Sequence, residues 1–431
     1  MRVFVRLRKV DPLPVPRVVT NAVSLYAVQV SGYILPLVTV PYLTRVLGPE
    51  GFGKISFAQS LSLWASIIIE FGFNLSGTRL VVLHREDHGR LAELAADIMG
   101  AKLLLSTAVV ALFLFLGAWI PLFRNEPGLM IWVLSSTLAM GFSPAWYFQG
   151  TERLALVSAL EVALRAVSVL LIFWLVRDTG DAWRYLALNA SASLLTTAIT
   201  LWMVYREVDW RWPRITGALR TIRSNWGMGA FRGVEQLYTS ANAFLLGLLA
   251  PSQAVGYFSG AERLAKAGVS LMGPLSQALY PYMNRLVTTD RDRAQSLVHR
   301  LVVVLGGLGA AAAAGGMLLA PWVVPLVLGQ EYGPSVLSFR WLVWLVPLRG
   351  VNSVLTMQWL FPHGRESLAN LSMIGATCAS LLLALVLVPR LGHVGMAIAA
   401  VAAEVTALVF LLHTARAAGQ KRTDLTGRRG A

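Results

Sequence analysis

The sequence predicts an all-α integral membrane protein with about twelve transmembrane helices. Of its 431 residues, 56% are hydrophobic and 14% are charged, and the mean hydropathy is +0.62, whereas an ordinary soluble domain has about 25% charged residues. Apolar runs near the ~20 residues that a helix needs to cross a bilayer recur along the whole chain. They lack the strict alternation of a β-barrel, so helices must satisfy the backbone in lipid.

Apolar runs between charged residues locate the predicted spans. They cover residues 19–44, 54–75, 97–119, 127–149, 157–176, 183–205, 225–249, 255–281, 298–320, 336–361, 367–388 and 394–415. The connections are short, and none could hold a separate soluble domain. Cys378 is the single cysteine and lies inside an apolar run, which excludes an intramolecular disulfide. We expect the first helix to remain uncleaved, because no small-residue cleavage site follows it.

The distribution of Lys and Arg predicts that both termini are cytoplasmic. In that orientation most basic residues fall in cytoplasmic segments, and the outer loops hold only Arg45, Arg124, Arg177, Arg184 and Arg390. The net charge of +15 is then a topology signal that matches anionic lipid in the inner leaflet. We therefore expect membrane lipid as a partner and no nucleic acid.

The sequence predicts that the chain consists of two related halves. A basic cytoplasmic segment covers residues 1–18, a first six-helix bundle 19–205, an amphipathic cytoplasmic connector 206–224, a second six-helix bundle 225–415, and a basic cytoplasmic tail 416–431. Residues 47–56 resemble residues 249–259, and residues 146–154 resemble residues 359–368, at equivalent places in the two bundles. Because each unit has an even number of helices, we expect a pseudo-two-fold axis along the membrane normal.

Many ionisable residues occur inside the predicted spans. Each costs at least ~2.5–3.5 kcal/mol at bilayer depth and usually pairs or faces a cavity. Basic residues outnumber acidic ones in this set, which pairing alone does not explain. We therefore predict a water-filled cationic central cavity that receives an anion, since the planar guanidinium of Arg binds two phosphate oxygens at once. The predicted substrate-binding residues are Arg232, Arg263, Lys266, Arg349, Arg165 and Lys54.

Acidic residues in the spans could couple an ion or pair with these cations. They are Glu235, Glu262, Glu404 and Glu70. The helical spacing of Glu161 with Arg165, and of Arg232 with Glu235, leaves simple intrahelical pairing open. Arg340 could instead snorkel to the interface.

The sequence indicates a transporter rather than an enzyme. It has no P-loop, and its short outer loops lack the carboxylate cluster of a glycan transferase. His84 and His88 share a helical spacing but lie in a segment expected to be solvated, so we predict no metal site. We expect no catalytic residues and no cofactor apart from a coupling ion, Na⁺ or H⁺, whose identity the sequence leaves open.

Three segments resemble the polysaccharide transporter branch of the multidrug/oligosaccharidyl-lipid/polysaccharide flippase superfamily, typified by O-antigen flippases. The resemblance is sharpest over residues 20–160. It rests on Asn21, Pro36 and the run Pro41-Tyr42-Leu43-Thr44-Arg45-Val46-Leu47-Gly48-Pro49-Glu50-Gly51-Phe52-Gly53, on Glu70-Phe71-Gly72-Phe73-Asn74 with Gly77-Thr78-Arg79, and on Trp146-Tyr147-Phe148-Gln149-Gly150.

The resemblance implies two six-helix bundles around a central cavity in the bacterial plasma membrane. It also implies that a polyprenyl-pyrophosphate-linked oligosaccharide, such as an O-antigen or exopolysaccharide repeat unit, moves from the inner to the outer leaflet by alternating access. A polysaccharide polymerase and glycosyltransferases would be further partners. A cation-coupled exporter of small amphiphiles remains the alternative, although the first span lacks the acid that drug-exporting relatives use. A membrane-embedded glycan transferase is a weaker alternative.

Overall fold

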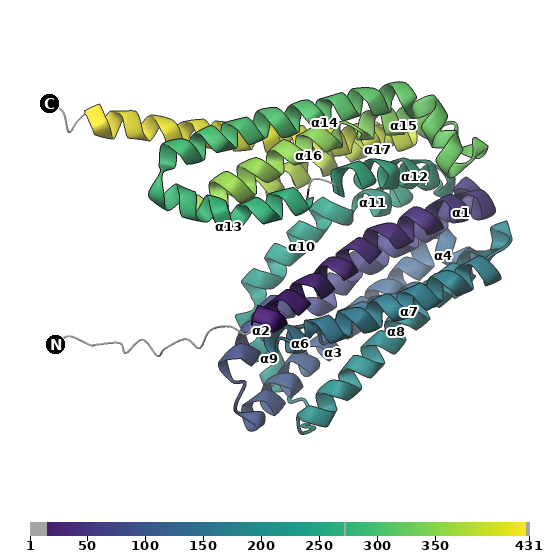
Figure 1. The fold of residues 1–431 in the computed structure, drawn as a ribbon. Coiled ribbons are helices and arrows are strands. Elements are labelled where there is room, and N and C mark those ends of the chain that lie inside the picture. The colour runs from purple at the N-terminus through teal and green to yellow at the C-terminus, as the bar shows by residue number, and fades with distance from the viewer. Residues whose placement is uncertain (1–14, 271–272, 428–431) are drawn as a thin grey trace, which may run out of the picture.

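A computed structural model of the chain describes residues 15–270 and 273–427, with side chains at residues 38–270, 276 and 279–414. Short turns join helices throughout these residues, which contain no strand. Figure 1 shows two groups of helices that lie together at one end and diverge toward the end where the chain termini lie. We call the group formed by α1–α8 the N-lobe and the group formed by α11–α17 the C-lobe. The outermost parts of the predicted segments 1–18 and 416–431 lie outside the described residues.

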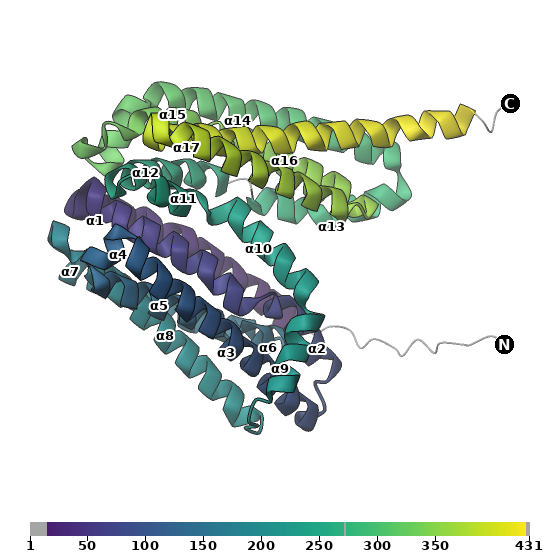
Figure 2. The ribbon, with the colours of Figure 1, turned by 180° about the vertical axis from the view of Figure 1, so that it is seen from behind.

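The N-lobe contains the first half of the chain. Its helices are α1 (Val15–Glu70), α2 (Phe73–Leu83), α3 (His88–Trp119), α4 (Pro121–Asn125), α5 (Pro127–Phe142), α6 (Ala145–Gly150), α7 (Leu154–Leu175), the 3₁₀ turn η1 (Thr179–Asp181) and α8 (Ala182–Glu207). α9 (Ile215–Ser224) lies beside this lobe, and α10 (Trp226–Ser240) runs from there toward the C-lobe, as Figure 2 shows.

The C-lobe contains longer and more interrupted helices. They are α11 (Asn242–Leu249), α12 (Ser252–Ser270), α13 (Gly273–Thr289), α14 (Arg291–Leu328), the 3₁₀ turn η2 (Gln330–Tyr332), α15 (Ser335–Leu342), α16 (Leu345–Ser353), the π-helix η3 (Val354–Leu360), the 3₁₀ turn η4 (Phe361–His363) and α17 (Glu366–Gly427).

Seven stretches of helix within the described residues are long and apolar enough to cross a membrane, which indicates a multi-pass membrane protein. The stretch Val38–Leu83 holds the end of the span predicted at 19–44 and all of 54–75, and Glu366–Thr414 holds 367–388 and almost all of 394–415. The break in α1 at Gly48 and that in α17 at Gly392 separate the two spans in each case. The spans predicted at 225–249, 255–281 and 336–361 fall on α10–α11, α12–α13 and α15–η3. Along α10–α11 and α15–η3 the helix is divided into shorter pieces, whereas α12 and α13 are described on either side of residues 271–272, which lie outside the described residues.

α1 turns back at Gly48. This residue has a φ of 64°, a left-handed conformation that glycine adopts without steric cost. Its carbonyl oxygen accepts a hydrogen bond from the hydroxyl of Tyr332 at 3.2 Å, which ties the turn to the C-lobe. Burial raises the pKa of the Tyr332 hydroxyl, so this donor keeps its proton at physiological pH.

The two lobes meet where the second part of α1 crosses α12. A Cβ atom added to Gly53 would lie 1.7 Å from the carbonyl oxygen of Ser252, and one added to Gly256 would lie 1.9 Å from that of Pro49. The helices therefore touch backbone to backbone, as small residues allow between membrane helices. Both contacts join the segments 47–56 and 249–259 that the sequence comparison paired.

The second pair of similar segments forms the same kind of turn in both halves. The backbone N–H of Arg153 donates to the carbonyl of Phe148 at 2.7 Å, and that of Arg365 donates to the carbonyl of Leu360 at 3.0 Å. A residue with positive φ precedes each donor, Glu152 at 60° and Gly364 at 67°. This geometry, a six-residue hydrogen-bonded turn with one left-handed residue, is typical of helix C-termini.

We predict that Gly53→Ala destabilises the protein, because its Cβ would collide with the carbonyl oxygen of Ser252. Overpacking of this kind costs about 1–3 kcal/mol, so the midpoint of thermal denaturation of the purified protein should fall. Gly307→Ala in α14 is the matched control, since a Cβ there meets nothing within 4 Å and Ala is favoured over Gly in a helix by about 1 kcal/mol. Equal midpoints for the two variants would contradict the close crossing.

Candidate functional site

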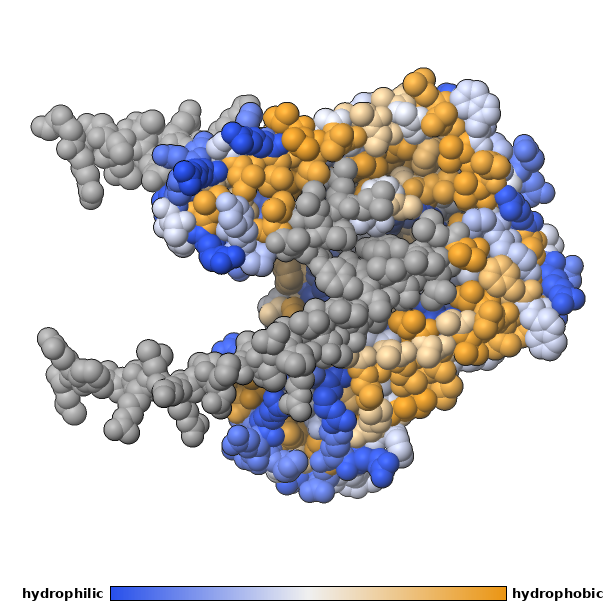
Figure 3. Space-filling view, in the orientation of Figure 1, coloured by the Kyte–Doolittle hydropathy of each residue, from blue (hydrophilic) through white to orange (hydrophobic). Residues whose placement is uncertain are grey.

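A cavity of about 310 Å³ lies between the two lobes, below the crossing of α1 and α12. We call it the central cavity. The N-lobe contributes residues of α1, α5, α7 and α8 to its wall, the C-lobe contributes residues of α11 and α12, and α10 adds Ser240. Its charged lining residues are Arg165, Glu262, Arg263 and Lys266, so three cations face one carboxylate. Figure 3 shows the molecule hollowed between the lobes on the side of the termini.

Arg263 is held in place without a carboxylate. Its guanidinium donates to Oε1 of Gln59 at 2.8 Å and lies 4.8 Å from the centre of the Phe52 ring. A cation above an aromatic ring gains about 0.5–2 kcal/mol, but the charge itself stays uncompensated. No ion pair involves Arg263 among the described side chains. Its position matches the predicted cationic cavity.

Lys266 and Glu262 form a pair on the same helix. The Lys266 Nζ lies 3.1 Å from Oε1 of Glu262, which also accepts from Nδ2 of Asn242 at 3.2 Å. Glu262 is buried while Lys266 is more than one-third exposed. The pair leaves the lysine able to reach the cavity while the carboxylate stays neutralised by its two donors.

Arg165 lines the central cavity from α7. The structure shows no ion pair between it and Glu161 in the described part of the chain, although both residues are exposed on α7. The intrahelical pairing that their spacing allowed is therefore absent there. Arg165 adds a second uncompensated cation to the cavity.

Two buried serines on the cavity wall have hydroxyl groups with no hydrogen-bond partner among the described residues. They are Ser56 and Ser259, which are 5% and 3% exposed. Each follows the crossing glycine, Gly53 or Gly256, by three residues. Most buried polar atoms in proteins are hydrogen-bonded, so these hydroxyls are available to a ligand or to water in the cavity.

Three predicted cavity residues do not line the central cavity: Lys54, Arg232 and Arg349. Lys54 pairs with Glu50 at 3.0 Å and with Glu126 at 2.7 Å, and it is not among the residues that line the central cavity. Arg232 pairs with Glu235 one turn away on α10, as its spacing allowed. Lys54 and Arg232 are both neutralised by neighbouring carboxylates.

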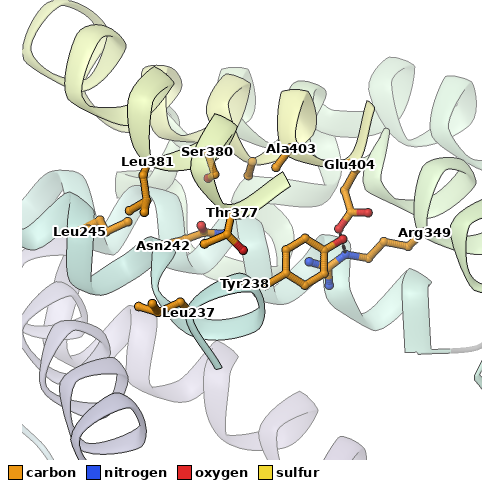
Figure 4. Close-up of a pocket in the computed structure, with 11 residues that line it drawn as sticks. Leu237, Tyr238, Asn242, Leu245, Arg349, Thr377, Ser380, Leu381, Ala403 and Glu404 are labelled. Carbon is orange, nitrogen blue, oxygen red and sulfur yellow. Dashed lines mark hydrogen bonds and ion pairs between the residues drawn. The ribbon is translucent and has the colours of Figure 1, made fainter. Parts of the chain in front are cut away.

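The half-buried Arg349 and the buried Glu404 form a cluster inside the C-lobe, away from the central cavity. Nε of Arg349 lies 2.8 Å from Oε1 of Glu404, and Nδ2 of Asn352 donates to Oε2 of Glu404 at 2.9 Å. Figure 4 shows the Tyr238 hydroxyl against the same carboxylate. An enclosed space of about 10 Å³ beside these groups has room for about one water molecule, and the same groups line a larger cavity of about 330 Å³ between α10, α16, η3 and α17. The carboxylate of Glu404 therefore neutralises the guanidinium of Arg349.

Glu70 has a structural role in the N-lobe. Its carboxylate accepts the backbone N–H groups of Gly72 at 3.0 Å and Asn74 at 2.7 Å, where α2 begins. A carboxylate at the start of a helix accepts from otherwise unpaired N–H groups and interacts favourably with the positive end of the helix dipole.

Lys102 is a buried cation that the sequence analysis missed. It is fully buried, and its Nζ donates to the carbonyl of Ser143 at 2.9 Å. Its place inside the predicted span 97–119 was the available signal, because a lysine in an apolar run rarely lacks a partner.

Comparisons with known proteins agree with this architecture. The model of a family described as polysaccharide biosynthesis protein matches residues 18–287. A protein of Escherichia coli (strain K12) named "Putative O-antigen transporter" is 26% identical over 398 residues, which cover 91% of this chain and 95% of the relative. A protein of Shigella dysenteriae with the same name is 25% identical over 397 residues, covering 91% and 98%.

Solved structures share the fold. The lipid II flippase MurJ in an inward closed conformation matches with a TM-score of 0.68 at 12% identity, over 92% of this chain and 87% of that one. An inward-facing multidrug resistance MATE family transporter of the MOP superfamily matches with a TM-score of 0.61 at 17% identity, over 91% and 99%. At these identities the likeness concerns the fold alone.

We predict that Glu404→Gln strongly destabilises the protein, because the half-buried Arg349 would lose its counter-charge. Breaking a buried pair costs about 3–5 kcal/mol, so the midpoint of thermal denaturation of the purified protein should fall markedly. The double variant Arg349→Leu with Glu404→Leu should recover most of the loss.

Arg293→Ala is the control for this pair, since it breaks an exposed ion pair with Asp290 worth about 0–1 kcal/mol. A midpoint for Glu404→Gln as high as that of Arg293→Ala would mean that the Arg349–Glu404 pair does not stabilise the C-lobe.

Proposed function

Because the chain belongs to the polysaccharide biosynthesis protein family, we propose that it is a flippase for a polyprenyl-pyrophosphate-linked oligosaccharide, an O-antigen or exopolysaccharide repeat unit. The cargo would move from the inner to the outer leaflet of a bacterial plasma membrane. The names of the two O-antigen transporter relatives and of the flippase MurJ support a flippase function. The protein would act as a transporter and not as an enzyme.

The charge of the central cavity carries the proposal. Arg165 and Arg263 have no carboxylate partner among the described residues, and Lys266 faces the same space. Cations in a partly desolvated cavity attract an anion strongly, and a guanidinium can bind two phosphate oxygens. A pyrophosphate group supplies those oxygens, while its polyprenyl tail can stay in the lipid.

We propose that the chain crosses the membrane twelve times, in bundles of six over residues 19–205 and 225–415. The N-lobe would supply two crossings from α1 and one each from α3, α5–α6, α7 and α8. The second bundle would supply α10–α11, α12–α13, α14, α15–η3 and two crossings from α17. The matching turns at Arg153 and Arg365 and the paired contacts of Gly53 and Gly256 support a pseudo-two-fold axis between the halves.

In this arrangement both termini would be cytoplasmic, and the crossing of α1 and α12 would close the outer end. The cargo head would enter the central cavity from the cytoplasmic side. Rocking of the lobes would then separate α1 from α12 and open the cavity outward. Connector 206–224, with α9, would link the two halves at the cytoplasmic face. Glycosyltransferases would supply the cargo, and a polysaccharide polymerase would consume it.

The carboxylates that a cation-coupled exporter would need are already occupied. Glu235 pairs with Arg232, Glu262 with Lys266 and Glu404 with Arg349. A carboxylate whose charge is already balanced by a cation attracts a further cation only weakly. These pairs favour the flippase over an exporter of small amphiphiles, and a coupling ion would have to bind elsewhere.

Deletion of the gene tests the function in cells. We expect lipid-linked repeat units to accumulate on the cytoplasmic leaflet and surface glycan to be lost, in a strain without a redundant transporter. Extraction of lipid-linked oligosaccharide and surface-glycan staining measure both effects. Normal surface glycan in that strain would exclude the proposal.

We predict that Arg263→Ala lowers transport at least tenfold while insertion into the membrane stays normal. The loss of a charged hydrogen bond to the cargo is worth about 1.5–3 kcal/mol, and Lys266→Ala should have a smaller effect in the same direction. Surface-glycan restoration in the deletion strain is the readout, with protein abundance measured beside it.

Arg293→Ala is the matched control, because this arginine is 82% exposed and pairs with Asp290 at the start of α14. Full transport by Arg263→Ala and Lys266→Ala together would show that the central cavity does not bind the cargo through these cations.

A further inference from the structure

A second cavity, of about 240 Å³, opens inside the N-lobe between α2, α5, α7 and α8. We call it the N-lobe chamber. It adjoins the central cavity, because Met140, Arg165, Asn189 and Ser193 line both spaces. Each volume is close to the ~300–1,000 Å³ of typical small-molecule sites. A ligand head that enters the central cavity can therefore extend into the chamber.

The chamber differs from the central cavity in charge. Its only charged lining residues are Glu161 and Arg165, one acid and one base, so the two side chains add no net charge although they form no ion pair among the described residues. The central cavity has Arg165, Arg263 and Lys266 against Glu262. A negatively charged group is therefore attracted to the central cavity. A neutral polar group gives up less electrostatic attraction than an anion does by occupying the chamber instead.

The chamber wall offers hydrogen-bonding groups that the described residues do not satisfy. Oδ1 of Asn74 is buried without a partner. Asn189 donates Nδ2 to the carbonyl of Tyr185 at 2.9 Å, which leaves its Oδ1 as an acceptor. Glu161 and Arg165 form no ion pair in the described part of the chain, so a carboxylate and a guanidinium face the same space. Ser193 adds a hydroxyl.

This set of groups fits a sugar ring. Each sugar hydroxyl is a donor and an acceptor at once, as is a serine hydroxyl. Amide and carboxylate oxygens accept from such hydroxyls, and a guanidinium donates to them. Phosphate offers acceptors only, so the unpaired acceptors of Asn74, Asn189 and Glu161 would repel it. The chamber therefore selects a neutral polyhydroxylated ligand.

We propose that the N-lobe chamber binds the sugar residue next to the pyrophosphate of the cargo, while Arg263 and Lys266 hold the pyrophosphate in the central cavity. Arg165 lies on the border between the two spaces and contacts both parts of the head. This assignment rests on the proposed flippase function. It divides the recognition of one cargo between a cationic site for the phosphates and a neutral site for the first sugar.

The test uses two probes and the purified full-length protein in lipid nanodiscs. The first probe is bare undecaprenyl pyrophosphate, and the second is the lipid-linked repeat unit extracted from the cells that make this protein. We expect the wild type to bind the second probe about tenfold more tightly than the first, since several hydrogen bonds to the sugar are added.

The variants Asn74→Leu and Glu161→Leu change residues that line the chamber but not the central cavity. We expect each to lose most of the preference for the second probe and to bind the first probe like the wild type. Unchanged binding of the first probe also shows that the variant is folded. Ser191→Leu is the control on α8, because Ser191 is exposed and does not line the chamber.

Three results would overturn the proposal. Equal binding of both probes by the wild type would mean that the sugar has no site, although the flippase function would stand. Unchanged preference in Asn74→Leu and Glu161→Leu would place the sugar outside the chamber. Failure of the wild type to bind either probe would overturn the flippase function and this assignment together.

Discussion

The crossing of α1 and α12 at Gly53 and Gly256 is the contact on which the shape of the cavity depends. Because neither position has a side chain, the two backbones touch, and the lobes are joined at one end while they diverge toward the termini. A helix rises 1.5 Å per residue, so Ser56 and Ser259 lie about 4.5 Å beyond the crossing and Arg263 about 10 Å from Gly256. The polar groups of both lobes thus begin where the helices separate.

The uneven distribution of paired charges separates structural from functional residues. Arg349, Lys54 and Arg232 each have a carboxylate within hydrogen-bonding distance. Their charges therefore cost little free energy in a low-dielectric environment, and they attract a further anion only weakly. Arg165 and Arg263 have none among the described residues. A cavity that keeps two such cations uncompensated is stabilised when an anion enters it, and the same anion must leave when the lobes reopen. Moderate affinity from a few cations suits a transporter better than a tight cage would.

The sequence predicted the helical membrane fold and the similar segments in the two halves, because apolar runs of ~20 residues and Gly-Pro turns are local features. Three of the six predicted substrate-binding residues, Arg165, Arg263 and Lys266, line the central cavity, and their role in binding stays a prediction. The sequence did not predict that Arg349 would face Glu404 inside the C-lobe or that Lys54 would meet Glu126, because helical spacing fixes the face of a helix and not the helix that lies opposite. Lys102 was missed for the same reason, since its partner is the backbone carbonyl of Ser143 in the link between α5 and α6.

The most direct test of the account is translocation in reconstituted vesicles. Lipid-linked repeat units extracted from the source cells would be incorporated with the purified protein, and membrane-impermeant periodate would oxidise the sugars exposed in the outer leaflet. We predict that the wild-type protein makes the inner-leaflet pool accessible as well, and that Arg263→Ala leaves it protected. An inner pool that becomes accessible equally fast in protein-free vesicles, or that stays protected with the wild-type protein, would contradict this prediction.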